Sequence, residues 1–161
     1  MDRRTEIIEA LQNGMDDTVS FFNSLPPDKL EMQVYQDGAC WTAQQVLGHL
    51  ITIERSMHWL FNDMLSGGQG SPEDFDVDRF NQSQTRKLDV FDLPALIGQF
   101  KAVRQETVAI VEGMSDSDLD RVGRHAFHGP GKLERFIRWA HEHARIHEDD
   151  IRKAIGVAAR Q

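Results

Sequence analysis

The stretch from Leu133 to Ala154 contains neither glycine nor proline, and it constrains the fold more than any other part of the chain. Such a stretch predicts one long helix, because every residue type in it tolerates helical geometry. With a turn of about 100° per residue, one face carries an apolar stripe that also holds His143, His147 and Asp150. The two imidazoles are one helical turn apart on that face. His143 and His147 are therefore the first candidate functional residues.

A histidine in an apolar stripe has two readings. It can be a core residue with an ordinary hydrogen bond. Alternatively, a pair spaced His-X₃-His on a helix can direct both rings at one divalent metal ion, which accepts a lone pair from each. The pair alone leaves both readings open, and a third ligand elsewhere in the chain would favour the metal.

A third imidazole occupies a comparable position on a second helix. Thr42 and Gln45 have the spacing of a capping box, and the apolar run that follows predicts a helix from about Ala43 to about Met64. His49 projects onto the same face as the core residues of this helix, whereas His58 projects to the opposite side. The sequence thus provides His49, His143 and His147 as a candidate ligand set.

Two more long helices are expected. Apolar residues recur at helical spacing between residues 5 and 24, and Pro26-Pro27 ends that helix. Asp92 is a plausible N-cap for another, which ends near Gly113. Arg104 projects near the inner face of this helix; we expect it to extend its charged end to the edge of the bundle, with a functional role as the alternative.

The remaining segments read as connections. Residues 24–40 and 66–72 look extended or loop-like, and residues 77–88 predict a short polar helix. Residues 116–131 look irregular, and we expect His125 and His128 there to be surface residues, since no carboxylate or cysteine stands beside them. The expected fold is all-α: an antiparallel four-helix bundle with long crossover connections, formed by residues 1–161 as a single domain.

Composition narrows the range of partners. The formal net charge of −8 argues against nucleic acid, whose phosphates require a basic surface. The longest apolar runs are too short to span a bilayer and the N-terminus does not resemble a signal peptide, so no membrane partner is expected. Cys40 is the only cysteine, which excludes an intrachain disulfide and a cysteine-based zinc site. These features predict a cytoplasmic protein.

The spacing also excludes two familiar metal sites. Ala144 follows His143, so the HExxH motif of zinc proteases is missing. No histidine has glutamate three residues before it, so the Glu-x-x-His motif of di-iron bundles is missing as well. A mononuclear site of His49, His143 and His147 remains, with at least one position open and with zinc or nickel as the suited metals. Asp150 is either a group that orients a ligand or an ordinary helix-end aspartate.

The stretch Trp41-Thr42-Ala43-Gln44-Gln45-Val46-Leu47-Gly48-His49-Leu50, followed much later by His143-Ala144-Arg145-Ile146-His147, resembles the DinB/YfiT-like superfamily of bacterial proteins. The similarity covers nearly the whole chain, including Asp78-Arg79-Phe80-Asn81 and Arg104. It implies a bundle with up-down-down-up helices, a homodimer, and a divalent metal on three histidines that match His49, His143 and His147 by position. Relatives include transferases that use low-molecular-weight thiols and a thiol-dependent maleylpyruvate isomerase, whose additional C-terminal domain we do not expect in this chain.

Three functional hypotheses follow. The chain is a metal-dependent transferase or hydrolase that acts on a small molecule, with a low-molecular-weight thiol as a possible partner; Arg104 and Asp150 would then be candidates for substrate contact. Alternatively, it is a non-catalytic metal-binding or stress-response module. The third hypothesis is a structural bundle with three core histidines and no ion.

Overall fold

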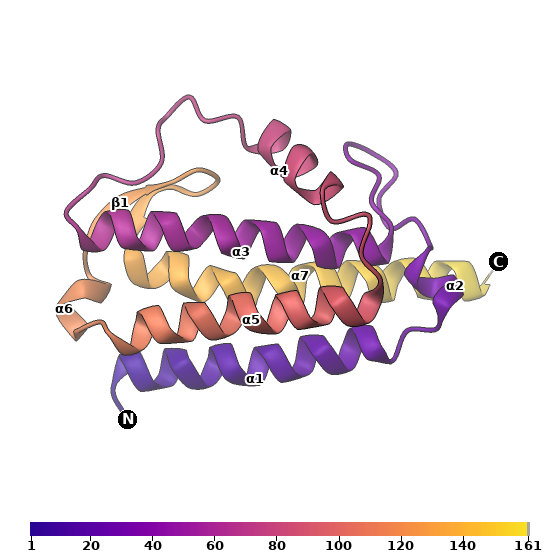
Figure 1. The fold of residues 1–161 in the computed structure, drawn as a ribbon, viewed down its shortest axis with the longest axis horizontal. Coiled ribbons are helices and arrows are strands. Elements are labelled where there is room, and N and C mark those ends of the chain that lie inside the picture. The colour runs from indigo at the N-terminus through magenta and orange to yellow at the C-terminus, as the bar shows by residue number, and fades with distance from the viewer. Residues whose placement is uncertain (161) are drawn as a thin grey trace.

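The computed structural model describes residues 1–160, and the side chains of residues 1–156. Four long helices form a bundle: α1 (Arg3–Asn23), α3 (Ala43–Leu65), α5 (Leu93–Glu112) and α7 (Leu133–Arg160). Around the bundle, α5 packs between α1 and α3, and α7 packs between the same two helices on the other side. Helices α1 and α7 run in one direction and α3 and α5 in the other, as Figure 1 shows. The four-helix bundle with long crossovers is confirmed, with the up-down-down-up order of the resembled superfamily.

The helix ends follow the expected capping chemistry. The Thr42 hydroxyl accepts from the backbone N–H of Gln45, while the Gln45 side chain accepts from the N–H of Thr42, which completes the capping box of α3. The Asp92 carboxylate accepts from the N–H of Ala95 at the start of α5. Capping therefore fixes where α3 begins, and this start places His49 in its second turn.

The connections contain more regular structure than expected. The first crossover includes a single turn that was not expected, α2 (Pro27–Leu30). The short helix expected over residues 77–88 is confirmed as α4 (Val77–Arg86), which lies against α3 (Figure 1). The expectation of an irregular segment over residues 116–131 is wrong. That segment forms α6 (Asp116–Leu119) and the antiparallel strands β1 (Val122–His125) and β2 (Gly129–Lys132). The two four-residue strands together contain three glycines and one proline. They therefore show little of the alternation of polar and apolar residues that predicts a strand, which explains why sequence reading missed them.

A layer of polar residues divides the bundle interior into two apolar clusters. One cluster gathers around Phe61, Met114 and Phe136, and the other around Phe22, Leu47 and Phe100. Between them, Arg104 is fully buried, where we expected its charged end at the edge of the bundle. Its guanidinium donates to the Glu54 carboxylate at 2.8–3.1 Å, and to the carbonyl oxygens of Leu11 and Ala140.

Arg104 therefore connects all four long helices, because Leu11 belongs to α1, Glu54 to α3 and Ala140 to α7. The Thr107 hydroxyl extends the layer through a 2.7 Å bond to Glu54 and a 2.7 Å bond to the ring of His58. A buried charge needs such complete pairing. The expectation that Arg104 reaches the edge of the bundle is wrong because a helical wheel cannot show that Glu54 on another helix faces it. In the part of the chain that the structure describes, no helix is apolar over enough length to cross a membrane.

Candidate metal centre

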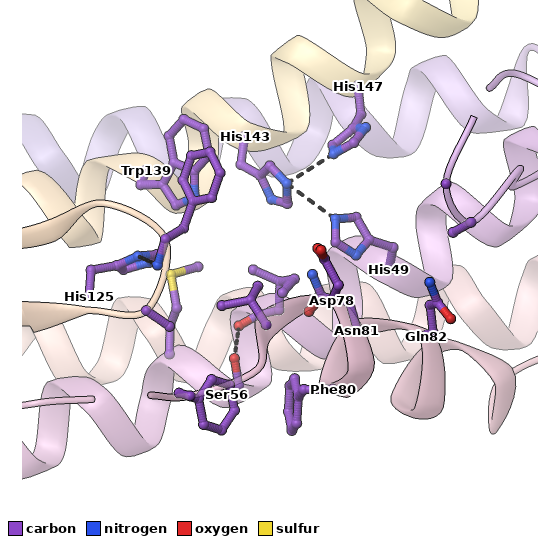
Figure 2. A pocket seen from close by; sticks show the side chains of 18 of the residues that line it. His49, Ser56, Asp78, Phe80, Asn81, Gln82, His125, Trp139, His143 and His147 are labelled. Carbon is purple, nitrogen blue, oxygen red and sulfur yellow. Dashed lines mark hydrogen bonds between the residues drawn. The ribbon is translucent and has the colours of Figure 1, made fainter. Parts of the chain in front are cut away.

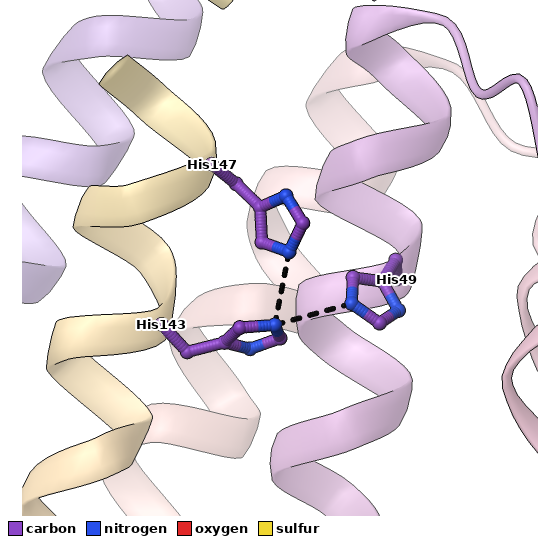
Figure 3. A group of neighbouring side chains, drawn as sticks. All are labelled: His49, His143 and His147. Atoms are coloured by element: carbon purple, nitrogen blue, oxygen red, sulfur yellow. Dashed lines mark hydrogen bonds between the residues drawn. The ribbon is translucent and has the colours of Figure 1, made fainter. Parts of the chain in front are cut away.

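The three histidines selected from the sequence meet at one point between α3 and α7. Nε2 of His143 lies 3.2 Å from Nε2 of His49 and 2.9 Å from Nε2 of His147. The three potential ligand atoms all lie within 4.8 Å of one another (Figure 3). Ligand nitrogens at 2.0–2.1 Å from a tetrahedral ion are separated by about 3.3 Å. The observed separations therefore fit a group that can hold one divalent cation.

Burial keeps these rings neutral and their lone pairs free. Desolvation lowers the pKa of His49 to about 3, helped by the nearby His147. It also lowers the pKa of His143 well below its usual value and lowers that of His147. Neutral imidazole is the form that binds metals, so burial prepares the cluster for a cation at neutral pH. Three inward-facing nitrogens cannot all satisfy one another by hydrogen bonds, since each pair needs one donor and one acceptor.

Tyr35 determines which nitrogen of His147 carries the proton. The Tyr35 hydroxyl donates to Oδ2 of Asp150 at 2.7 Å and lies 2.6 Å from Nδ1 of His147. Because its single proton goes to the carboxylate, the hydroxyl oxygen accepts from Nδ1–H of His147. The lone pair of His147 is then on Nε2, which faces the cluster. Asp150 thus acts on the ring through Tyr35, an arrangement that commonly orients metal-binding histidines.

Tryptophan rings pack against the other two imidazoles. Trp41 lies over His49 with ring centroids 4.3 Å apart, and Trp139 stacks on His143 at 5.1 Å. Nδ1 of His49 is buried and has no hydrogen-bond partner among the described residues. Packing against Trp41 therefore helps to hold the ring of His49, and on its Nδ1 side no described hydrogen bond fixes the tautomer.

The cluster forms one side of a cavity of about 1000 Å³, at the upper end of the size of small-molecule sites. Its walls come from α3, α4, α7, the first crossover and the β1–β2 hairpin (Figure 2). Large apolar side chains dominate the lining: Trp41, Ile53, Met57, Trp59, Leu60, Phe75, Phe80, Phe127, Trp139 and Ile146. The nitrogen cluster therefore opens onto a space that can admit an organic molecule.

The other candidate residues differ in their relation to this cavity. Arg104 is not among its lining residues, since it is held in the polar layer with Glu54. The expectation that His125 is a surface residue is wrong: it is buried, lines the cavity, and accepts on Nδ1 from the N–H groups of Phe127 and His128. His128 is half-buried and its ring contacts Trp139 edge-on.

Sequence reading missed several residues of the site. Tyr35 lies in an irregular connection that has no periodicity, so nothing in the sequence connected it with His147. Asp78 and Asn81 both line the cavity from α4, as Figure 2 shows. In the sequence they stood out only within the stretch that carries the family resemblance, and their three-residue spacing on a short helix is the signal that could have indicated a shared face.

Comparison with solved structures supports the fold. YfiT from Bacillus subtilis, described as a probable metal-dependent hydrolase with an unusual four-helix bundle topology, has a TM-score of 0.79 at 15% identity, covering 99% of this chain and 90% of that one. An uncharacterized protein from Clostridium difficile 630 has a TM-score of 0.73 at 14% identity, covering 95% of each chain. At these identities the likeness establishes the fold alone.

The colibactin self-resistance protein ClbS, solved in complex with double-stranded DNA, has a TM-score of 0.71 at 16% identity and covers 94% of each chain. The exclusion of nucleic acid, which rested on net charge, receives no support from this comparison. No curated protein matches the sequence significantly. The sequence profile of the DinB superfamily, however, matches residues 10–150. The chain belongs to the DinB superfamily.

Proposed function

We propose that this chain is a metal-dependent enzyme that activates a nucleophile for attack on a small organic molecule. His49, His143 and His147 would hold the metal through their Nε2 atoms. One observation carries the proposal: three imidazole nitrogens converge at the wall of a large apolar cavity. Three protein ligands leave a position for a further ligand, which distinguishes catalytic sites from closed structural ones.

Zinc and nickel are the metals we propose, because imidazole suits both. A divalent cation held by three neutral imidazoles keeps its positive charge and lowers the pKa of a bound thiol or water. The residues around it have separate tasks. Tyr35 and Asp150 hold His147 in the required tautomer, Trp41 and Trp139 limit rotation of the other two rings, and the apolar walls exclude water from the reacting atoms.

Thiol transfer is the reaction we favour. In it, a low-molecular-weight thiol loses its proton to solvent, its sulfur forms a bond to an electrophilic carbon, and the leaving group departs with the bonding electrons. Within the described residues, no carboxylate is hydrogen-bonded directly to any of the three rings. A thiol, whose ordinary pKa is about 8.5, needs much less help to ionise than water does. The cavity volume also leaves room for a thiol beside its co-substrate.

Hydrolysis is the second candidate, because YfiT is described as a probable metal-dependent hydrolase. A three-histidine site is able to lower the pKa of a bound water to near 7 without a separate base. The homodimer, the cytoplasmic location and the single domain remain predictions from the resemblance and the composition.

The test begins with metal content. Elemental analysis of the purified protein should give about one divalent ion per chain, and His147→Ala should lose it. His141→Ala is the matched control, because His141 lies on the same helix but is not part of the cluster. Metal content that is the same in His147→Ala and wild type would overturn the proposed site.

Activity is tested next, with the chelated protein and with the protein reloaded with zinc or nickel. We expect conjugation of a thiol to an alkylating electrophile, monitored by loss of free thiol, in the reloaded protein alone. Metal-dependent ester cleavage without any thiol would favour hydrolysis. Bound metal without turnover in either assay would overturn the enzyme proposal and favour a non-catalytic metal-binding module.

A further inference from the structure

The cavity beside the histidine cluster has aromatic walls and carries negative but no positive side-chain charge. Among the described residues that line it, Asp37 and Asp78 are the only carboxylates, and neither lysine nor arginine is present. All three tryptophans of the chain, at positions 41, 59 and 139, belong to its lining. A site for carboxylate-bearing molecules normally supplies arginine or lysine, so this lining is unsuited to them.

Two basic groups close to the cavity have partners outside its lining. Arg124 on β1 forms a 2.9 Å ion pair with Glu73, and Arg135 at the start of α7 lies 3.2 Å from the ring of His128. The segment that leads into α4 along one edge of the cavity adds two further carboxylates, Asp74 and Asp76. The side-chain charges at the opening therefore favour cations over anions.

The apolar part of the lining extends to the surface. Trp59, Phe75, Phe127 and Ile146 line the cavity and are also exposed, so half of the eight large exposed hydrophobic residues in the described chain gather here. Exposed apolar patches mark ligand grooves or interfaces with proteins or membranes, and the continuity of this patch with a cavity favours a ligand. Aromatic faces combined with carboxylates bind organic ammonium groups through cation–π attraction and charge.

We propose that the organic substrate of this site has a large planar apolar body and a positive charge, and that carboxylate-bearing analogues bind poorly. The inference rests on the proposed function, since it identifies the substrate class of the same cavity. It concerns the part of the substrate that contacts the walls; the reacting group faces the imidazole nitrogens. Asp78 is assigned as a specificity-determining residue, because it lines the cavity from α4 and carries charge without contributing a ligand nitrogen (Figure 2).

Three probes of nearly equal shape test the proposal: 1-naphthylmethylamine, 1-naphthylmethanol and 1-naphthoate. Binding is followed by the NMR signals of the three tryptophan indole N–H groups, each of which belongs to the cavity lining. In the chelated protein at low salt, we expect the ammonium to bind best and the carboxylate worst, with a ratio of dissociation constants of at least about tenfold. Repeating the ammonium and alcohol titrations with zinc should preserve their order.

Substitutions separate charge from shape. Asp78→Asn should reduce the ratio of the affinities for the ammonium and the alcohol by about threefold or more, and leave the affinity for the alcohol unchanged. Asp16→Asn is the control, because Asp16 is exposed on α1, a helix that contributes nothing to the cavity lining. Trp59→Ala should weaken the binding of all three probes to a similar extent, because it removes an apolar wall of the cavity.

The proposal is overturned if the carboxylate binds as tightly as the ammonium, if no probe shifts an indole signal, or if Asp78→Asn leaves the ammonium advantage intact. Its failure is distinct from that of the proposed function. The same titrations in His147→Ala should keep the probe order, whereas the proposed function is judged by metal content and turnover alone.

Discussion

The hydroxyl of Tyr35 lies 2.6 Å from Nδ1 of His147 and connects that ring to the carboxylate of Asp150. Burial, together with this bond to Asp150, raises the pKa of the Tyr35 hydroxyl well above its usual value, so the hydroxyl keeps its proton. Without Tyr35, nothing in the described structure would select the tautomer that directs the Nε2 lone pair of His147 at the cluster.

Tyr35→Phe and Asp150→Asn should therefore weaken metal binding. Groups that orient a metal-binding histidine typically contribute about 10–100-fold in affinity. Competition against a chromophoric chelator measures the loss. Asp149→Asn is the control, since Asp149 is exposed and paired with Arg152; an equal loss in that variant would contradict a specific role for Tyr35 and Asp150.

Metal removal should lower the melting temperature. A metal that binds only the folded chain stabilises it by about 2.7 kcal/mol when its free concentration is 100 times the dissociation constant. Scanning calorimetry with zinc and with a chelator should show this shift in wild type and in His141→Ala. The His49→Ala protein should melt at the same temperature in both conditions, because the cluster has lost a ligand.

His125 should make stability depend on pH. Burial, with the nearby His128, lowers its pKa from 6.5 to about 4. Between these values the unfolded chain binds a proton that the folded chain does not, so the free energy of unfolding rises with pH. The contribution of the neutral His125 to stability is therefore lost as pH falls from 6.5 towards 4. In His125→Asn, the Asn oxygen takes the place of Nδ1 as acceptor for the two backbone N–H groups.

In His125→Asn the free energy of unfolding should depend less steeply on pH. Its slope should be lower by up to about 1.4 kcal/mol per pH unit, the value for one proton. Urea denaturation at several pH values between 4 and 7, with chelator present, measures both slopes. Equal slopes in the two proteins would show that His125 titrates normally.

Glu148 should make stability depend on pH in the direction opposite to His125. It faces away from the site and lies buried near Thr18, and desolvation raises its pKa from 4.5 to about 7. Between these values the folded chain holds a proton that the unfolded chain lacks, so stability falls as pH rises through this window. Glu148→Gln should raise the melting temperature at pH 8 and leave it unchanged at pH 4.5. Glu142→Gln, on an exposed position of the same helix, should change neither.

Removing Arg104 should destabilise the whole bundle. Arg104→Met leaves the Glu54 carboxylate buried without its partner, which typically costs about 3–5 kcal/mol. Arg124→Gln breaks the exposed pair with Glu73 and should cost less than about 1 kcal/mol. Chemical denaturation compares the two, and equal losses would mean that the polar layer contributes no more than a surface ion pair.

The bundle and the cluster of three imidazoles could be predicted from the sequence because both depend on helical periodicity. His49, His143 and His147 each stood out as polar residues on an apolar helix face, and such faces meet in a bundle core. Arg104 stood out in the same way, but its partner Glu54 lies 50 positions away, and a helical wheel shows nothing across helices. Tyr35 and His125 belong to a connection and to a short hairpin, whose positions are set by tertiary packing.

His49 and His143, two of the three candidate ligands, lie 94 positions apart in the sequence. A ribosome must have synthesised the chain through His147, and α7 must have docked against α3, before the three rings can meet. If the cluster binds a cation as proposed, a chain that has not yet docked α7 has no complete centre to capture it, and metal occupancy would mark a folded bundle.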